Sequence, residues 1–239
     1  MKRTILSLVS FNNMIISLTG FMGCGKSSVG RELSKLLCCR FVDLDTEIET
    51  RSGCTVAEIF ETSGEAEFRR LEKETLKDIL ETGGRVLEIP KTPALPTVGH
   101  PLAGGGMSSP SSGTPACKNQ EHPSNERPQM ILALGGGAVM TPECERMVHE
   151  QTVCVYLRTS VDELVARLSD EAAGRPLLGT QPGTENNALR KEDLYKRIKD
   201  LMAQRCQTYE KTAHIIIDTD GKTVDAVSEE IVKSISSIF

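Results

Sequence analysis

Short apolar runs alternate along the chain with segments whose apolar residues recur every three or four positions. The runs lie at 14–18, 40–44, 130–134, 153–157 and 214–218. Between the first two runs, helical spacing is seen at Val29, Leu33, Leu36 and Leu37. Strands that alternate with helices pair in parallel, with helices on both faces of the sheet. The pattern therefore predicts a three-layer α/β fold whose functional residues lie in loops at the carboxyl ends of the strands.

One region interrupts this pattern, at about residues 86–128. Within it, Pro90–Pro128 holds eight of the eleven prolines and five glycines, so it can neither propagate a helix nor bury a core. We interpret it as a long-loop or disordered insertion, whose triplet Gly104–Gly106 has no strand before it. Residues 1–13 are predicted to be a loose tail. Residues 14–239 then form a single domain interrupted by the insertion.

Composition narrows the classes of function. The chain has 28 basic and 33 acidic residues and a net charge of -5, which argues against a nucleic-acid partner, since such domains carry a basic excess. The apolar runs are far shorter than the ~20 residues that cross a membrane. Eight cysteines without a Cys-x-x-Cys pair or a secretory signal favour free thiols over disulfides or zinc. We expect a cytoplasmic monomer with no membrane partner.

A phosphate-binding motif follows the first apolar run. The stretch GFMGCGKSS fits G-x-x-x-x-G-K-[ST] and precedes a segment of helical spacing. Its glycines let backbone N–H groups curl around phosphate oxygens, where the helix N-terminus adds favourable potential. Lys26 reaches the outer phosphates, and the Ser27 hydroxyl is a ligand of Mg²⁺. The motif predicts a nucleoside triphosphate site, with a glycine turn that binds nothing as the alternative.

Two acids follow the second apolar run, in the stretch FVDLDTEIE. Asp43 and Asp45 are two positions apart, and in an extended segment such side chains point to the same face. Both carboxylates then emerge toward the phosphate loop, where one serves Mg²⁺ and the other a substrate hydroxyl. The alternative is that one of them only caps the helix that follows.

Two arginines fall on apolar faces of predicted helices. Arg69 lies at the edge of the stripe formed by Phe68, Leu76 and Leu80, and Arg205 lies in the middle of the stripe of its own helix. A buried charge without a partner is costly, so each arginine either pairs with an internal carboxylate or points with the other into a pocket for an anion. The guanidinium fork suits a carboxylate ligand.

A second glycine triplet and a polar segment complete the candidate chemistry. Gly135–Gly137 directly follows a strand-like run, and because glycine stabilises neither a strand nor a helix, something at this point must require a backbone without side chains. The Gly/Pro-punctuated stretch Arg167–Asn187 lies between helices and predicts a lid. Arg175 in this lid is placed to stabilise charge on a transferring phosphoryl group, although an exposed surface arginine is the alternative.

With these residues in view, the chain resembles the shikimate kinases. The resemblance covers about residues 14–84 and 129–235, and it rests on GFMGCGKSSVGR, FVDLDTEIE, IFETSGEAEFRRLE, LGGGAV, GRPLL and the pair Arg205 and Tyr209. It implies a P-loop kinase fold with a five-stranded parallel sheet, a lid and a substrate-binding subdomain. It also implies transfer of the γ-phosphoryl group of ATP to the 3-hydroxyl of shikimate, with Mg²⁺, in the aromatic amino acid pathway.

The resemblance implies roles for particular residues. Asp45 hydrogen-bonds the shikimate hydroxyls and assists as a base, while Asp43 is the outer-shell partner of Mg²⁺ beside Ser27. Arg69 and Arg205 hold the substrate carboxylate. The turn Gly135–Gly137 lays its backbone against the substrate ring, with Gly136 and Gly137 as the direct contacts. A strand delivers this triplet to the pocket, where side chains would collide with the substrate.

The nucleotide side is implied in the same way. The residues expected around ATP are Gly23, Cys24, Gly25, Lys26, Ser27, Ser28, Arg167 and Arg175. Arg175 acts on the phosphates, and Arg167 stacks near adenine. The catalytic set is Lys26, Asp45 and Arg175.

Three departures from the family pattern are visible. Ser28 stands where the family commonly has threonine, and CQTY follows Arg205 directly where a proline usually precedes the tyrosine. The insertion at 86–128 replaces a short link, and it could obstruct the pocket or bind an unknown partner. Two other functions stay open: a kinase for a gluconate-type polyol acid, and a nucleotide-binding protein without catalysis whose insertion is an interaction arm.

Overall fold

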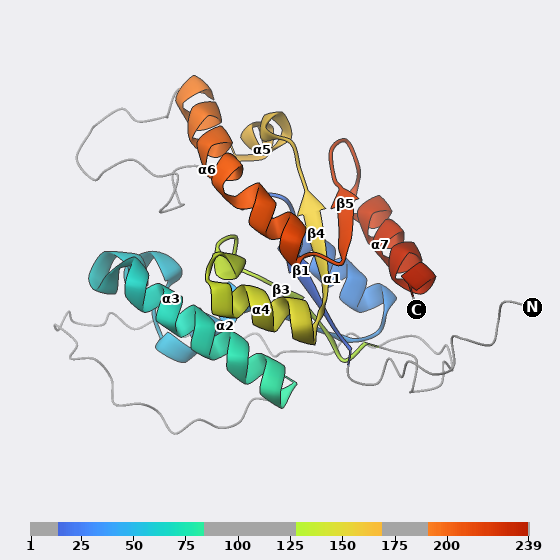
Figure 1. The fold of residues 1–239 in the computed structure, drawn as a ribbon, viewed down its shortest axis with the longest axis horizontal. Helices are drawn as coiled ribbons and strands as arrows, with labels where there is room; N and C mark the ends of the chain where they lie inside the picture. The colour runs from blue at the N-terminus through green and yellow to red at the C-terminus, as the bar shows by residue number, and fades with distance from the viewer. Residues whose placement is uncertain (1–13, 84–127, 169–190, 239) are drawn as a thin grey trace, which may run out of the picture.

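The computed structural model describes residues 14–83, 128–168 and 191–238. Within these ranges the chain forms a five-stranded, all-parallel sheet in the order β2-β3-β1-β4-β5 (Figure 1). The strands are β1 (Ile15–Thr19), β2 (Arg40–Asp43), β3 (Met130–Ala133), β4 (Val153–Arg158) and β5 (Ile215–Asp218). Each strand lies within one residue of its predicted run at either end, and the predicted α/β class is confirmed.

Helices cover both faces of this sheet. They are α1 (Lys26–Leu36), α2 (Leu44–Ser52), α3 (Val56–Thr82), α4 (Pro142–Gln151), α5 (Val161–Leu168), α6 (Lys191–Thr212) and α7 (Val224–Ile238), with a 3₁₀ helix, η1 (Ala138–Met140). The central strand β1 sends Ile16 and Leu18 into a core with α1 and α7, and Ile15 into a second core with α3 and α4. Because both faces are covered, the central strand β1 is buried along its length and is apolar except at Ser17 and Thr19.

Two local features were not predicted from the apolar pattern. Helix α3 begins with a capping box, in which the Thr55 hydroxyl accepts from the backbone N–H of Glu58 and the Glu58 side chain accepts from that of Thr55. It is then kinked at Gly64, whose φ of 80° and ψ of 173° are not helical. Helix η1 follows the second glycine triplet, because the N–H of Ala138 donates to the carbonyl of Gly135 over 3.1 Å. The tight turn keeps the triplet backbone at the carboxyl end of β3.

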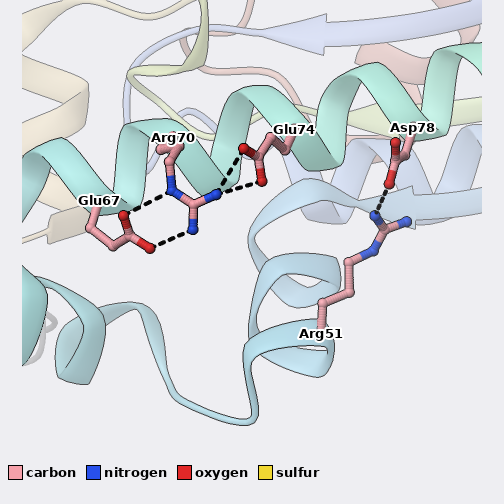
Figure 2. Close-up of polar contacts among 5 residues, drawn as sticks. All are labelled: Arg51, Glu67, Arg70, Glu74 and Asp78. Carbon is pink, nitrogen blue, oxygen red and sulfur yellow. Dashed lines mark hydrogen bonds and ion pairs between the residues drawn. The ribbon is translucent and has the colours of Figure 1, made fainter. Parts of the chain in front are cut away.

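One surface ion pair links α2 to α3, and two others lie within α3 (Figure 2). Arg51 of α2 lies 2.9 Å from Asp78 of α3. Two turns earlier in α3, Arg70 lies between Glu67 and Glu74, with guanidinium–carboxylate distances of 2.6 and 2.7 Å. Such exposed pairs add little to stability, because water and salt screen them. Their main consequence here is that Arg70 has its hydrogen-bond partners at the surface of α3.

The described residues on the two sides of the insertion, Gly83 and Gln129, lie next to each other. The carbonyl of Gly83 accepts hydrogen bonds from the Arg40 guanidinium at 2.8 Å and from the Gln129 side chain at 3.5 Å. The backbone N–H of Gln129 donates to the carbonyl of Met14 at 2.7 Å. These residues lie at the amino ends of β1, β2 and β3, whereas the phosphate loop and the glycine triplet follow the carboxyl ends. The insertion between them and the tail 1–13 lie outside the described residues.

Among the helices in the described ranges, none combines the length and apolar character needed to cross a membrane.

Candidate active site

The phosphate loop lies between β1 and α1, at the carboxyl end of the sheet. Gly23 and Gly25 have φ of 80° and 95°, a left-handed backbone that side chains disfavour. The Lys26 ammonium folds back over the loop and donates to the carbonyls of Gly20 and Phe21 at 3.0 and 2.9 Å. The loop, including Cys24 and Ser28, lines a cavity of about 750 Å³. The predicted nucleotide-binding motif therefore has both the backbone shape and the space that phosphates require.

Ser27 and Asp43 both line this cavity and are hydrogen-bonded to each other. The Ser27 hydroxyl donates to one carboxylate oxygen of Asp43 at 2.6 Å, and the other oxygen accepts from the backbone N–H of Asp45 at 3.2 Å. Asp43 is thus the N-cap of α2, and Asp45 lies in the first turn of that helix. The predicted extended geometry for the two acids is wrong, because the cap ends β2 at Asp43. Both side chains nevertheless line the same cavity.

Two acids lie beside the glycine triplet, Glu72, which is buried, and Asp45, which is half-buried. Burial raises the pKa of the Asp45 carboxyl above its ordinary value, and the nearby Asp43 raises it further, while Lys26 opposes the shift. Burial likewise raises the pKa of Glu72, against the opposing effect of Arg69. Within the described structure, one oxygen of each carboxyl is buried without a hydrogen-bond partner. Both acids also line the second cavity described below, which brings their carboxyl groups close to a ligand bound there.

The glycine triplet packs against the side chains of the site. A Cβ atom at Gly135 would lie 2.7 Å from Asp45 Oδ1 and 2.8 Å from Glu72 Oε1. At Gly137 it would lie 2.5 Å from a guanidinium nitrogen of Arg69. Collision with the site's own charged groups is therefore a reason for glycine that the sequence did not reveal, in addition to the predicted collision with a substrate.

Arg69 and Arg205 line a second cavity of about 280 Å³ together with Phe60 and Phe68. Arg69 pairs with Glu72 at 2.7 Å and with Glu65 at 3.2 Å. For Arg69 both predicted alternatives therefore hold, an internal carboxylate and a place in the pocket wall. Arg205 is 9% exposed and approaches the carbonyl of Gly136 at 3.4 Å. Two guanidinium groups beside apolar rings suit a small ligand that carries a carboxylate.

The two cavities share three residues. Met22, Asp45 and Gly136 line both the phosphate-loop cavity and the arginine cavity. A nucleotide in the first cavity and a small acid in the second would therefore meet at these residues. This arrangement fits direct transfer of a phosphoryl group between two bound molecules.

The far end of the first cavity is formed by residues around Arg167. Arg167 pairs with Glu163 at 2.9 Å and donates to the carbonyls of Cys24 and Thr219, each at 3.4 Å. The predicted position of Arg167 at the nucleotide site is thus consistent with the cavity lining. Arg175 and most of the predicted lid lie outside the described residues.

Sequence reasoning missed two groups of residues in these cavities. The loop after β5 supplies Thr219, Lys222 and Thr223, which the rule that loops at carboxyl ends of strands carry function could have found. Glu72 was also missed, although its spacing of three from Arg69 places both on one side of α3.

Comparisons with known proteins agree with this geometry. The family model for shikimate kinase matches residues 22–89 and 120–236. A shikimate kinase of Thermus thermophilus is 31% identical over 220 residues, which are 92% of this chain and 89% of that one. One of Bordetella avium is 34% identical over 196 residues, 81% of this chain and 72% of that one.

Solved structures give the same result. The structure of shikimate kinase from Acinetobacter baumannii in complex with shikimate has a TM-score of 0.68 at 26% identity, over 95% of this chain and 96% of that one. The structure of shikimate kinase from Aquifex aeolicus has a TM-score of 0.61 at 27% identity, over 94% and 98%. Sequence motifs, site geometry and these relatives lead to one conclusion: the chain belongs to the shikimate kinase family.

Proposed function

We propose that this protein transfers the γ-phosphoryl group of ATP to the 3-hydroxyl of shikimate, giving shikimate 3-phosphate and ADP, in the pathway to aromatic amino acids. The observation that carries the proposal is the junction of the two cavities at Met22, Asp45 and Gly136. A phosphate loop lies on one side of it and two arginines on the other. The proposal brings the substrates together where an acid is available to the acceptor hydroxyl.

The acceptor is held at both ends in this proposal. Arg69 and Arg205 bind its carboxylate, and the backbone of Gly135–Gly137 lies along its ring. Asp45 accepts a hydrogen bond from the reacting hydroxyl, and the position of this residue in the lining of both cavities supports that role. As the phosphoryl group arrives, the hydroxyl proton passes to Asp45, whose raised pKa makes it a better proton acceptor than an ordinary aspartate.

The phosphates are held by the loop backbone and by Lys26. The Lys26 ammonium exchanges the carbonyls of Gly20 and Phe21 for phosphate oxygens and stabilises negative charge on the group in transfer. We assign Arg175 the same task from the lid side and Arg167 a contact near adenine.

The metal site of the proposal is formed by Ser27 and Asp43. Their oxygen atoms are 2.6 Å apart on the wall of the phosphate cavity, and hydroxyl and carboxylate oxygens are the donors that Mg²⁺ prefers. When bound, Mg²⁺ supplies positive charge that neutralises the phosphates. Ser27 would be a direct ligand and Asp43 a partner through water. The monomeric state and the cytoplasmic location remain predictions.

Release of ADP from the full chain with ATP and Mg²⁺ tests the proposal. Strong dependence on shikimate, with gluconate inactive, is the expected result. Turnover with gluconate in place of shikimate would transfer the proposal to the polyol-acid kinases. ATP binding without turnover on either acid would make the chain a nucleotide-binding protein.

A further inference from the structure

Two donors of α6 converge on one backbone oxygen of the substrate cavity. The Tyr209 hydroxyl donates a short hydrogen bond to the carbonyl of Gly136. Arg205, one helical turn earlier, approaches the same oxygen at 3.4 Å. Tyr209 is fully buried, whereas Arg205 also lines the cavity in which we place the substrate carboxylate. The phenol thus lies behind the cavity wall, where it contacts the Gly136 carbonyl and the Arg205 side chain, both of which belong to that wall.

The phenol is fixed in this position. Its ring stacks on that of Tyr156 with centroids 5.2 Å apart. Burial raises the pKa of the Tyr209 hydroxyl far above its ordinary value, although Arg205 opposes the shift, so the group stays protonated and remains a donor. The Gly136 turn has little freedom on its other side, since a Cβ there would lie 3.2 Å from the backbone nitrogen of Met22 in the phosphate loop.

The two hydrogen bonds to Gly136 differ in strength. A carbonyl oxygen has two lone pairs, and hydrogen bonds weaken as the distance grows beyond about 3.2 Å. The Arg205 contact, at 3.4 Å, is a long one, whereas the buried Tyr209 hydroxyl is a full donor to the same oxygen. Arg205 therefore keeps most of its five N–H donors for other acceptors.

We infer that Tyr209 is a positioning residue that holds the Gly136 carbonyl and so leaves the Arg205 guanidinium available to the carboxylate of the substrate. The inference rests on the proposed function, because it concerns the same cavity. Without the phenol, Arg205 becomes the strongest donor near Gly136 and turns toward it. The substrate must then compete with the enzyme's own backbone for this arginine.

Tyr209→Phe tests the inference, with Tyr156→Phe as the matched control. Tyr156 is an equally buried phenol of the same stack, but its hydroxyl interacts with Cys206, whereas that of Tyr209 donates to Gly136. We expect Tyr209→Phe to raise the shikimate KM about tenfold, with kcat and the ATP KM within about twofold of wild type. Tyr156→Phe is expected to leave all three within about twofold. Equal shikimate KM values in the two variants would overturn the inference.

A double-mutant cycle shows whether Tyr209 acts through Arg205. In the Arg205→Ala background, Tyr209→Phe should change shikimate binding by less than about twofold, because the arginine that it positions is absent. An undiminished penalty in that background would overturn the inference and assign Tyr209 a structural role. Thermal unfolding of both single variants separates positioning from stability. A melting temperature of Tyr209→Phe far below that of Tyr156→Phe would also overturn the inference and assign Tyr209 a structural role. Failure of the proposed function would be recognised separately, as absence of shikimate-dependent turnover in the wild type.

Discussion

Consecutive arginines of α3 have opposite surroundings, which makes them a matched pair for substitution. Arg69 lines the substrate cavity, whereas Arg70 is 51% exposed and lies between two surface glutamates (Figure 2). Arg69→Ala removes one of the two groups assigned to the substrate carboxylate. A hydrogen bond to a charged group contributes about 1.5–3 kcal/mol, and about 1.4 kcal/mol is a tenfold change in affinity. We therefore expect the shikimate KM to rise about 10- to 100-fold.

The same substitution removes the ion-pair partner of Glu72, which is 1% exposed. Arg69 lowers the pKa of Glu72 against the effect of burial, so its loss raises that pKa further. Glu72 then takes up a proton instead of remaining charged, which limits the loss in the free energy of unfolding to about 1–3 kcal/mol. Thermal unfolding of Arg69→Ala measures this loss separately from the change in affinity.

Initial rates of ADP release across shikimate and ATP concentrations provide the assay. Arg69→Ala should leave the ATP KM within about twofold of wild type, and Arg70→Ala should leave both KM values within about twofold. Equal effects of the two substitutions on the shikimate KM would refute the assignment of Arg69 to the substrate carboxylate. So would a shikimate KM of Arg69→Ala that stays close to the wild-type value.

Three further predictions follow from the geometry. Asp45 has a raised pKa in the folded state, so the folded protein binds its proton more tightly and stability falls as pH rises from about 4 through the raised pKa. Asp45→Asn should therefore melt above wild type by a margin that grows with pH while turnover is lost; a margin that is constant between pH 4 and pH 8 would contradict this. Gly137→Ala should displace the Arg69 guanidinium and raise the shikimate KM at least about tenfold, and an effect that adds fully to that of Arg69→Ala would argue against a shared cause. Replacement of residues 84–127 by about four Gly and Ser residues should leave kcat and KM within about twofold and stabilise the fold by up to about 2 kcal/mol, because the closed loop is shorter; lost turnover would show that the segment serves the site.

Much of the fold could be predicted from the sequence, because a strand that is covered on both faces consists mostly of apolar residues and therefore appears as an apolar run. The five runs predict the strands to within one residue. The apolar pattern did not predict the kink at Gly64 or helix η1, since both depend on the backbone angles of a few residues. Such local choices leave the apolar pattern unchanged.

The candidate site was predictable where a residue type has one dominant use. The phosphate loop is of this kind, as are arginines on apolar helix faces. For Asp43 and Asp45 the sequence left two geometries open, because an aspartate after an apolar run can stand at the end of a strand or cap the next helix. The structure shows that Asp43 does both. Glu72 escaped notice because a glutamate on a charged helix is usually exposed, and only tertiary packing buries it.

The contacts among Gly83, Gln129 and Met14 place the ends of the inserted segment on the side of the sheet opposite the active site. Because the described chain ends and resumes at the amino ends of the strands, we expect turnover to depend little on the length of the segment that is joined there. The same position is a suitable site for protein engineering, since a reporter domain inserted between Gly83 and Gln129 would join the chain at the end of the sheet opposite the active site.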